Sequence, residues 1–559
     1  FINPRREIMI REIFTNDPED MYVDAEEDVP ESDDSSDEEL PENLTALDEV
    51  DERLDLEDSE VSFEWKMGNL IPRPVNFARG CSGVKRLPNN NKEAECFKMF
   101  MTTSVMDMIV AETNTYAQSL REKISNGKLA KWVDTTVAEL YVFLAVFFSM
   151  GLIKKNNIRD YWTTNPLLST PFFGTIFSQD RFLLLLRCLH FSNSTSNDPL
   201  RKIRSIITPI VQSFNEIFYP YQDLCIDESM VKWKGRLSFK QFIPSKRHRF
   251  GIKLFVLCDV QTGYVQDIIV YTGKSTDISM ITELGMSGSV VSTLMKPFIG
   301  KGHILYVDNW YTSPTLFRYL FRNQTGACGT VRPNRKGMPR FKGKMSKGDV
   351  EHFNNGQLLA TKWHDKRDVH ILSSVHSGTM VPTGKVDYAT GRVVNKPCCV
   401  LQYNHKMGSV DNLDRRNTFV ECARKTLKWY RKLFFYVLDV AVFNSFVVHR
   451  QLTRQELTYQ RFRENLASQL IEEFHTPRRP SCGGRPTLDG PLRLSARHFP
   501  TLVTQTDQQG GRTRRRCRVC QTTTRRQQMR KATKYMCVQC DIPLCVTPCF
   551  EEYHTLKHY

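Results

Sequence analysis

Six of the sixteen cysteines in this 559-residue chain crowd into residues 517–549, and their spacing restricts what that segment can fold into. Cys517 pairs with Cys520 and Cys537 with Cys540 in two Cys-x-x-Cys patterns, with residues 521–536 between them. This spacing is typical of a zinc ribbon, in which thiolates hold the metal. Residues 517–559 contain few large apolar side chains, so we expect metal to stabilise this segment.

Two further pairs of potential ligands follow these cysteines: Cys545 with Cys549, and His554 with His558. Eight ligands are enough for two tetrahedral zinc ions. In an interleaved arrangement, the first and third pairs bind one ion and the second and fourth pairs bind the other. No acid stands where a catalytic base is needed, so we expect both zinc ions to be structural.

Charge is divided unevenly along the chain. Residues 17–60 contain 22 acidic residues and one basic residue, Arg53, which gives a net charge of −21. The whole chain carries +15, so the remainder carries 15 + 21 = +36. A body this basic favours a polyanionic partner such as nucleic acid, although a merely soluble basic protein is the alternative. Residues 1–60 lack apolar periodicity, which predicts disorder.

The hydrophobic period changes along the chain. From about residue 94 to 225, apolar residues recur every three or four positions, which predicts helices. Short β-branched runs between Gly and polar breaks then predict a three-strand meander, a helix near 278–298, a strand at HILYV, a helix from about 313 and a strand near ACGTV. This order is typical of an RNase H-like sheet. The longest apolar stretch, LYVFLAVFFSMGLI, is shorter than the roughly 20 residues of a spanning helix, so no membrane partner is expected.

Three aspartates stand at the ends of predicted elements. Asp227 follows the apolar run LCI, Asp308 follows HILYV, and Asp411 lies where a helix begins. Acids on two adjacent strands and on a helix packed over them can meet and hold two Mg²⁺ ions for phosphoryl transfer. The alternative is that each is an ordinary strand-end or helix-capping aspartate. Glu228 and Asp414 lie nearby, and Asp414 is one helical turn after Asp411.

Around these residues the chain resembles the piggyBac transposase family. The similarity covers residues 95–559 and follows the family in order through CIDESMVKWKGRLSFKQFIPSKRHRFGIKLFVLCDVQTGYV, YVDNWYTSPTLF, CGTVRPNRKGMP, YNHKMGSVDNLDRRN and RKTLKWYRKLFFYVLDVAVFNSF. One departure is Arg415–Arg416, where many members carry Gln after the aspartate.

The resemblance implies a cut-and-paste DNA transposase that acts at TTAA sites and excises an element at its terminal inverted repeats through hairpin intermediates. The implied catalytic residues are Asp227, Asp308 and Asp411, with Asp414 as a further ligand of two Mg²⁺ or Mn²⁺ ions. It also implies a homodimer on double-stranded DNA and a PHD- or RING-like arrangement of the two zinc ions. The dense Arg and Lys residues of the terminal module also fit a nuclear-localisation signal, so we expect a nuclear location.

The implied architecture is multidomain α+β, with an RNase H-like core, flanking helices, a β-rich insertion and a terminal zinc domain. Its expected parts, in chain order, are the disordered acidic region 1–60, the first helical dimerisation and DNA-binding segment 61–218, the first catalytic segment 219–331, the insertion 332–402, the last catalytic segment 403–452, the last helical segment with a linker 453–510 and the zinc-binding domain 511–559.

Basic clusters mark the candidate DNA contacts, because each Lys or Arg that neutralises a phosphate releases counterions. A solvated basic loop is the alternative for each. The candidates are Lys246, Arg247 and Arg249; Arg332, Asn334, Arg335 and Lys336; and Arg514, Arg515 and Arg516. Trp310 and Tyr311 could stack on a flipped base, although such aromatics more often belong to a core.

Two other function classes compete with an active transposase. A domesticated descendant would bind DNA or chromatin without cutting it, and the intact aspartates weigh against this reading without excluding it. A PHD-like histone reader would rest on the cysteine module alone.

Overall fold

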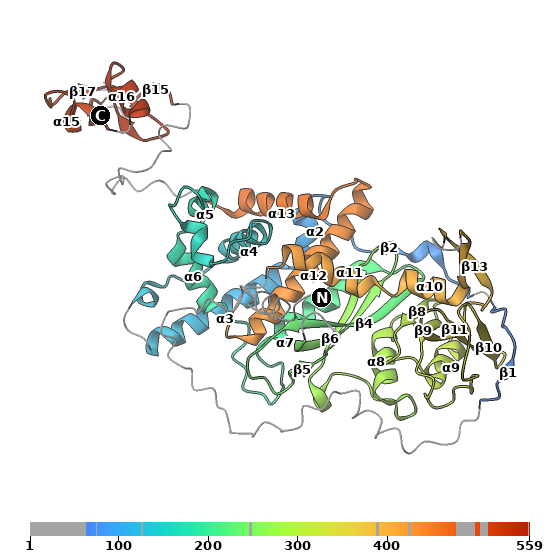
Figure 1. The fold of residues 1–559 in the computed structure, drawn as a ribbon. Coiled ribbons are helices and arrows are strands. Elements are labelled where there is room, and N and C mark those ends of the chain that lie inside the picture. Colours follow the sequence, from blue (N-terminus) through green and yellow to red (C-terminus); the bar gives the residue numbers. More distant parts are fainter. Residues whose placement is uncertain are drawn as a thin grey trace, which may run out of the picture. The chain divides into compact units, whose positions relative to one another are not determined.

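The computed structural model describes residues 63–73, 75–123, 127–244, 249–386, 391–422, 426–476, 498–503, 513–556 and 558–559. It divides into two compact units, Phe1–Pro477 and Arg478–Tyr559, both drawn in Figure 1. The expectation of disorder for residues 1–60 lies outside the described residues.

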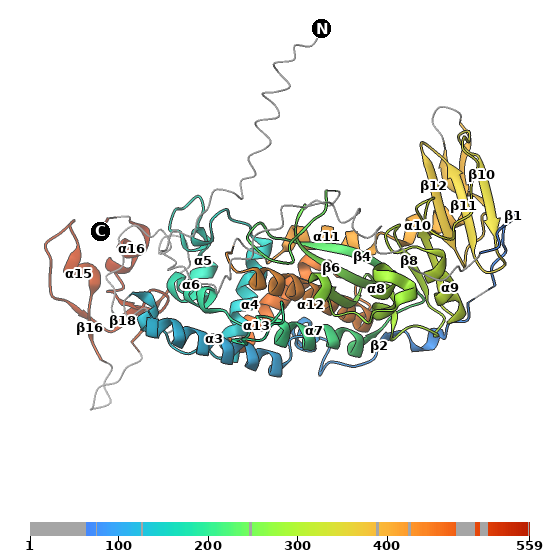
Figure 2. The same ribbon diagram turned by 90° about the horizontal axis from the view of Figure 1, so that it is seen from below.

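Helices form one end of the first unit, and Figures 1 and 2 both show α3 to α6 there. Thr136 caps the buried helix α4 by accepting the Glu139 amide, which satisfies one of the unpaired donors of the first turn. From the other end of the unit's sequence, α13 packs against α4 and α12 packs against α2. The helices are α2 (Glu93–Lys98), α3 (Thr103–Lys123), α4 (Val137–Leu152), α5 (Pro171–Ile176), α6 (Gln179–Cys188), α7 (Arg204–Ile217), α12 (Trp429–Thr453) and α13 (Tyr459–Phe474).

Helix α12 is the one described helix that is long and apolar enough to cross a membrane by length and composition. Inside the folded unit, 89% of its apolar window is buried. It therefore has the properties of the central helix of a hydrophobic core.

A mixed sheet occupies the middle of the unit, with the neighbour order β7-β6-β4-β8-β9. The meander and the two later strands are confirmed: β4, β6 and β7 are antiparallel, whereas β8 runs parallel to β4 and β9 runs parallel to β8. The elements are β4 (Asp223–Lys232), β5 (Gln241–Phe242), β6 (Phe250–Asp259), β7 (Val265–Val270), α8 (Gly285–Met295), β8 (Ile304–Val307), α9 (Pro314–Arg322) and β9 (Gly326–Thr330).

Both faces of β4 are covered, which explains its almost unbroken burial. Leu224 and Ile226 point into a core shared with α8 and α9, whereas Cys225 points into the core formed with the helical part. The strands approach closely at Gly329, where a Cβ atom would lie 2.2 Å from Thr312 Oγ1 and 2.5 Å from the Val307 carbonyl oxygen. Only glycine fits there, so the β8–β9 pairing beside Asp308 depends on it.

The region 332–402 continues this sheet, because β12 pairs with β9 and the edge extends through β11 and β10. Figure 2 shows these strands at the end of the unit opposite the helices. The segment 61–218 is not helical throughout, because its strand β1 closes the far edge against β10. The strands are β1 (Lys66–Met67), β2 (Gly83–Val84), β3 (Phe218–Tyr219), β10 (Val350–Asn354), β11 (Leu359–His364) and β12 (Asp368–Ser373).

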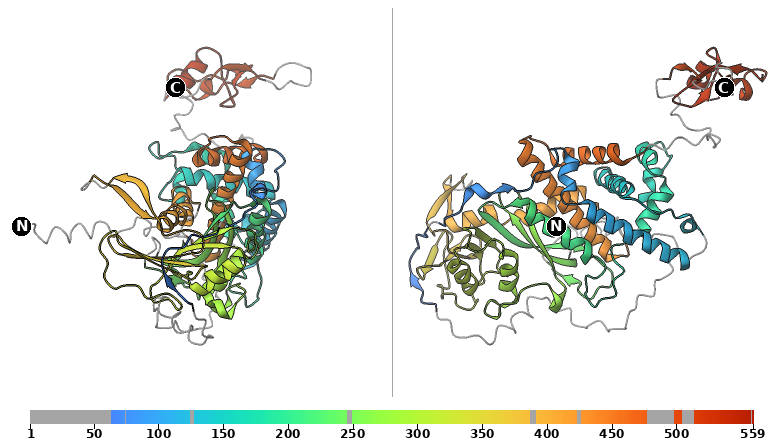
Figure 3. Two further views of the ribbon diagram at one scale, coloured as in Figure 1. Left: turned by 90° about the vertical axis from the view of Figure 1, so that its right-hand side faces the viewer. Right: turned by 180° about the vertical axis from the view of Figure 1, so that it is seen from behind.

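Beyond this sheet, β13 (Met380–Val386) and β14 (Val393–Pro397) form a separate hairpin, which projects from the unit in Figure 3. The chain then returns through α10 (Cys398–Lys406) and α11 (Ser409–Val420), and α11 packs across β4 and β6.

The second unit is small, and cysteines make up much of its core alongside Leu544, Phe550 and Tyr553. Its elements are β15 (Pro500–Leu502), β16 (Arg515–Arg516), α15 (Arg518–Thr522), β17 (Ala532–Thr533), β18 (Tyr535–Cys537), β19 (Ile542–Pro543) and α16 (Cys549–Thr555). Strand β15 pairs with β18, so a segment well before the first cysteine is part of this fold.

Candidate functional site

Two of the predicted aspartates lie side by side in the central sheet. Asp227 is on β4, and Asp308 directly follows β8, whose Val307 is in register with Ile226. Carboxylate oxygens of Asp227, Asp308 and Glu228 lie within 4.8 Å of one another. Asp308 is fixed by its own loop, because its Oδ1 accepts from the Trp310 amide at 2.9 Å and its carbonyl accepts from Thr312 Oγ1 at 2.7 Å.

Glu228 is the third acid of this group, and it has a basic partner. Lys253 Nζ on β6 lies 3.5 Å from a Glu228 carboxylate oxygen, and both side chains are about nine-tenths buried. The same ammonium lies 4.5 Å from the centre of the Trp310 ring. Lys253 therefore links the acid on β4 to the loop that follows Asp308.

Helix α11 brings the remaining predicted acids, Asp411 and Asp414, over the face of β4 that carries Asp227. Cys225 Sγ donates to the Met407 carbonyl at 3.0 Å just before the helix, and Ser229 Oγ donates to both oxygens of Asp414 at 2.8 Å. Cys225 and Ser229 flank Asp227 on one face of the strand, because side chains alternate. Asp411 lies in the first turn of α11 between these two contacts, with its own side chain exposed, and is not part of the 4.8 Å group.

The electrostatics of this acidic group favour a cation. Burial, and after it the charge of Glu228, raise the pKa of Asp308 to about 6. Buried carboxylates that repel one another are stabilised by a divalent cation, and oxygen ligands suit Mg²⁺ or Mn²⁺. The residues present therefore fit the metal that the sequence predicts. Asp414 differs from this group, because its carboxylate is already bonded to Ser229.

Two cysteine-rich groups form in the second unit. The first contains Cys517, Cys520, Cys545 and Cys549, which are the first and third pairs of the interleaved prediction. Its sulfurs are 3.4 Å apart for Cys520 and Cys549 and 4.0 Å apart for Cys520 and Cys545. A tetrahedral zinc holds two thiolates about 3.8 Å apart, so this group fits zinc.

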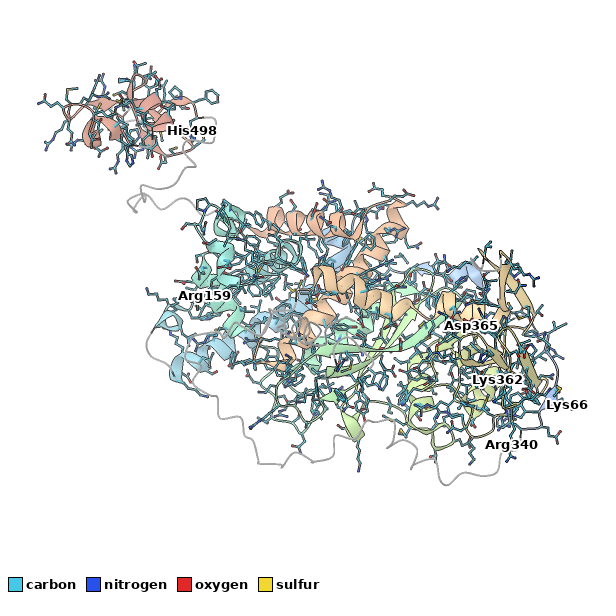
Figure 4. All side chains as sticks on the ribbon, in the orientation of Figure 1. Lys66, Arg159, Arg340, Lys362, Asp365 and His498 are labelled. Atoms are coloured by element: carbon cyan, nitrogen blue, oxygen red, sulfur yellow. The ribbon has the colours of Figure 1, made fainter. Side chains whose placement is uncertain are left out.

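The second group contains Cys537, Cys540, His554 and His498, whose side chain is labelled in Figure 4. His498 Nδ1 lies 3.3 Å from Cys537 Sγ and 3.5 Å from Cys540 Sγ, and His554 Nε2 lies 3.6 Å from Cys540 Sγ. A tetrahedral zinc separates sulfur and nitrogen ligands by about 3.6 Å. These four side chains therefore also fit zinc.

The prediction of His558 as the eighth ligand is wrong in this structure. His558 is exposed and lies outside both groups, beyond the end of α16. His498 takes the place because β15 pairs with β18, which brings residues 498–502 against Cys537. Sequence reasoning missed it, since 39 residues separate His498 from Cys537.

Comparisons with known proteins agree with this geometry. A family model described as "Transposase IS4" matches residues 92–446, and one described as "DDE_Tnp_1-like zinc finger" matches residues 495–555, which include His498. Human piggyBac transposable element-derived protein 3 is 25% identical over 520 residues, covering 89% of this chain and 82% of the relative. Human piggyBac transposable element-derived protein 2 is 26% identical over 388 residues, covering 63% and 61%. The chain is a piggyBac-type transposase family member.

A solved structure shares the fold of this piggyBac-type chain. It is the cryo-EM structure of a piggyBac transposase synaptic complex with hairpin DNA. The two chains align with a TM-score of 0.63 at 24% identity, over 84% of this chain and 99% of the other. At that identity the likeness concerns the fold.

The candidate DNA contacts of this piggyBac-type chain lie in different environments. Arg335 is half-buried, and its Nη2 donates to the Asn309 and Trp310 carbonyls at 2.8 and 3.0 Å. Arg335 therefore braces the loop after Asp308. Its Nη2 group is occupied by these carbonyls and is not available to a phosphate in this structure. In the same segment Asn334 and Lys336 are exposed and Arg332 is half-buried, whereas Arg249 is exposed beside β6. Lys246 and Arg247 lie outside the described residues.

The basic cluster before Cys517 lies at the strand β16, which contains Arg515 and Arg516 and is preceded by Arg514. Arg514 and Arg516 are exposed, and Arg515 is half-buried with its Nη1 3.7 Å from Asp541. Exposed basic side chains at this strand leave the cluster available to an anionic partner.

The aromatic residues after Asp308 belong mainly to the interior. Tyr311 is fully buried, so stacking of this ring on a base is excluded in this structure. Trp310 stacks on Phe255 with ring centres 5.6 Å apart and also covers Lys253. The Trp310 ring thus packs against β6 and against Lys253, the partner of Glu228.

Proposed function

We propose that this chain is a cut-and-paste DNA transposase that excises an element at its terminal inverted repeats through hairpin intermediates and inserts it at TTAA sites. The observation that carries the proposal is the position of Asp227: it lies beside Asp308 across two parallel strands and under α11, between the Cys225 and Ser229 contacts. We also assign the strands β7-β6-β4-β8-β9 to an RNase H-like catalytic core.

In this proposal the acids act as ligands, and the surrounding residues position them. Asp227 and Asp308 offer oxygens from the sheet, Asp411 offers one from α11, and Asp414 anchors that helix through Ser229. Two divalent cations held there would stabilise the attacking and leaving oxygens of an in-line displacement at phosphorus. Lys253 neutralises Glu228, which limits the negative charge that incoming DNA meets.

We assign the second unit to a zinc-stabilised module with two structural ions that reads the inverted repeats. The two ligand groups support the ions, and exposed Arg514 and Arg516 support contact with DNA. Double-stranded DNA as the substrate, a homodimer as the working form and a nuclear location complete this proposal.

A DNA- or chromatin-binding protein without transposition is the second candidate. It is favoured by the acidic group itself, in which the third close acid is the lysine-paired Glu228 instead of Asp411. The curated human relatives are described as transposable element-derived proteins. Both candidates bind DNA, so only a measurement of cutting separates them.

An excision assay in cells distinguishes the candidates. The donor carries an element whose flanking repeats come from the same genome as the chain. We expect the wild-type chain to excise it and Asp227→Ala, Asp308→Ala and Asp411→Ala to abolish excision while DNA binding is largely kept. Excision by any one of these variants would refute the triad, and a wild-type chain that binds DNA but never excises would favour the second candidate.

A further inference from the structure

A hollow surface on the first unit is lined by arginines that the acidic site does not use. One hollow of about 370 Å³ is lined by Arg416, Arg450 and Arg454, and a second of about 110 Å³ shares Arg416 with it. Gln261 and Thr262, in the turn between β6 and β7, also line both. The two hollows therefore form one groove between that turn, α11 and α12, which we call the arginine groove.

No carboxylate lines the arginine groove among the residues that the structure describes. Arg416, Arg450 and Arg454 are exposed, and within the described part of the chain none of them forms an ion pair. Arg450 lies in the last turn of α12, and Arg454 follows the helix as its left-handed C-cap residue, with its amide donating to the Arg450 carbonyl at 2.9 Å. Three converging cations without a counter-charge create a positive potential that an anion would relieve.

Aromatic rings hold two of these arginines in place. The Arg416 guanidinium lies 5.7 Å from the centre of the Phe443 ring, and that of Arg450 lies 5.5 Å from the Phe446 ring. Guanidinium groups stack on such faces and keep their N–H donors free for bidentate contacts to phosphate oxygens. Stacking also reduces the side-chain entropy that binding would otherwise remove.

The groove lies on the helix that carries Asp411. Ser409, Asn412 and Arg416 line it from α11, whereas Asp414 on the same helix points at β4 through its bonds to Ser229. One side of α11 thus faces the groove and another faces the acidic site. A helix is about 10–12 Å across with its side chains, so one duplex can reach both.

We propose that the arginine groove binds the phosphate backbone of DNA adjacent to the stretch that enters the acidic site. The inference rests on the proposed function, because it takes DNA as the partner. A duplex fits better than a small anion, since the groove extends over two hollows and is lined by three separate guanidiniums. Duplex DNA offers regularly spaced phosphates to such a set of cations.

The salt dependence of DNA binding by the full chain tests this proposal. The probe is a mixed-sequence duplex oligonucleotide, and fluorescence anisotropy gives Kd between about 50 and 200 mM NaCl. Each phosphate contact contributes about 0.9 to the slope of log K against log salt, so R416Q/R450Q/R454Q should lower its magnitude by about 2.7. Over that salt range the wild-type Kd should then rise about 40-fold more than that of the triple variant.

Two controls separate the groove from general charge and from folding. Arg461→Gln removes one charge from an exposed arginine that is already paired with Glu464, and it should leave the slope unchanged. R416K/R450K/R454K keeps the charges and should keep most of the slope. Thermal unfolding of every variant should match the wild type, because all of the replaced side chains are exposed.

Different outcomes overturn different statements. If the wild type binds DNA and the triple Gln variant keeps the wild-type slope, the groove proposal is wrong and the proposed function stands. Tighter DNA binding by the triple variant would also overturn it, and would point to the acidic segment 17–60 of this chain as the occupant. If the wild type binds no DNA, the proposed function fails and the groove proposal with it.

Discussion

The zinc ligand set gives the sharpest single prediction. Replacing His498 by Ala removes one nitrogen from the group that contains Cys537, Cys540 and His554. Structural zinc sites of this kind have apparent binding free energies of about 10–16 kcal/mol, so one ligand of four represents about 2.5–4 kcal/mol. At 1.4 kcal/mol for each factor of ten, zinc affinity at that site should fall by about two to three orders of magnitude.

The measurement is competition with a chromophoric chelator on the full chain, together with elemental analysis of bound zinc. We expect the wild type to retain two zinc ions at a chelator concentration where His498→Ala retains one. His558→Ala is the matched control, since His558 is exposed and outside both groups, and it should bind zinc like the wild type. If His558→Ala lost an ion and His498→Ala kept both, the ligand assignment would be refuted.

Two further predictions concern the first unit. Arg463→Met should destabilise this unit by about 3–5 kcal/mol. Arg463 and Asp439 form a fully buried ion pair at 3.1 Å, so the substitution leaves the buried Asp439 charge unpaired. A denaturant midpoint equal to that of the wild type would contradict this prediction. Burial and then the nearby Lys428 lower the pKa of His190 to about 4, against about 6.5 when unfolded, so its contribution to stability is complete above pH 6.5 and is lost as pH falls toward 4. The thermal midpoint of His190→Asn should therefore fall less between these pH values than that of the wild type, and an equal fall would contradict the burial argument.

The sequence predicted the sheet at Asp227 and Asp308 because each ends an apolar run, and burial on both faces of a strand leaves that pattern. Apolar runs of this kind depend on local order along the chain. The spacing of the cysteines alone also allowed a ribbon that joins Cys517 and Cys520 to Cys537 and Cys540, and the grouping with Cys545 and Cys549 came from the resemblance to PHD and RING domains.

Features that depend on contacts between residues far apart in the chain could not be predicted from the sequence. The pairing of β12 with β9 merges the inserted strands with the central sheet, and alternation predicts a strand without naming its neighbour. Arg335 looked like a surface cation, but its carbonyl partners at Asn309 and Trp310 become visible only in three dimensions. The pairing of Glu228 with Lys253 could have been anticipated only from the register of β4 against β6.

Binding of Mn²⁺ to the purified full chain, followed by electron paramagnetic resonance, tests the central claim most directly. The wild type should bind Mn²⁺ in competition with Mg²⁺, and Asp227→Asn and Asp308→Asn should each lose most of that binding, because their oxygens converge within 4.8 Å. Asp267→Asn, on strand β7 at the other side of β6 and outside this group, should bind like the wild type. Equal Mn²⁺ binding by the wild type and both site variants would contradict a metal-dependent active site at these aspartates.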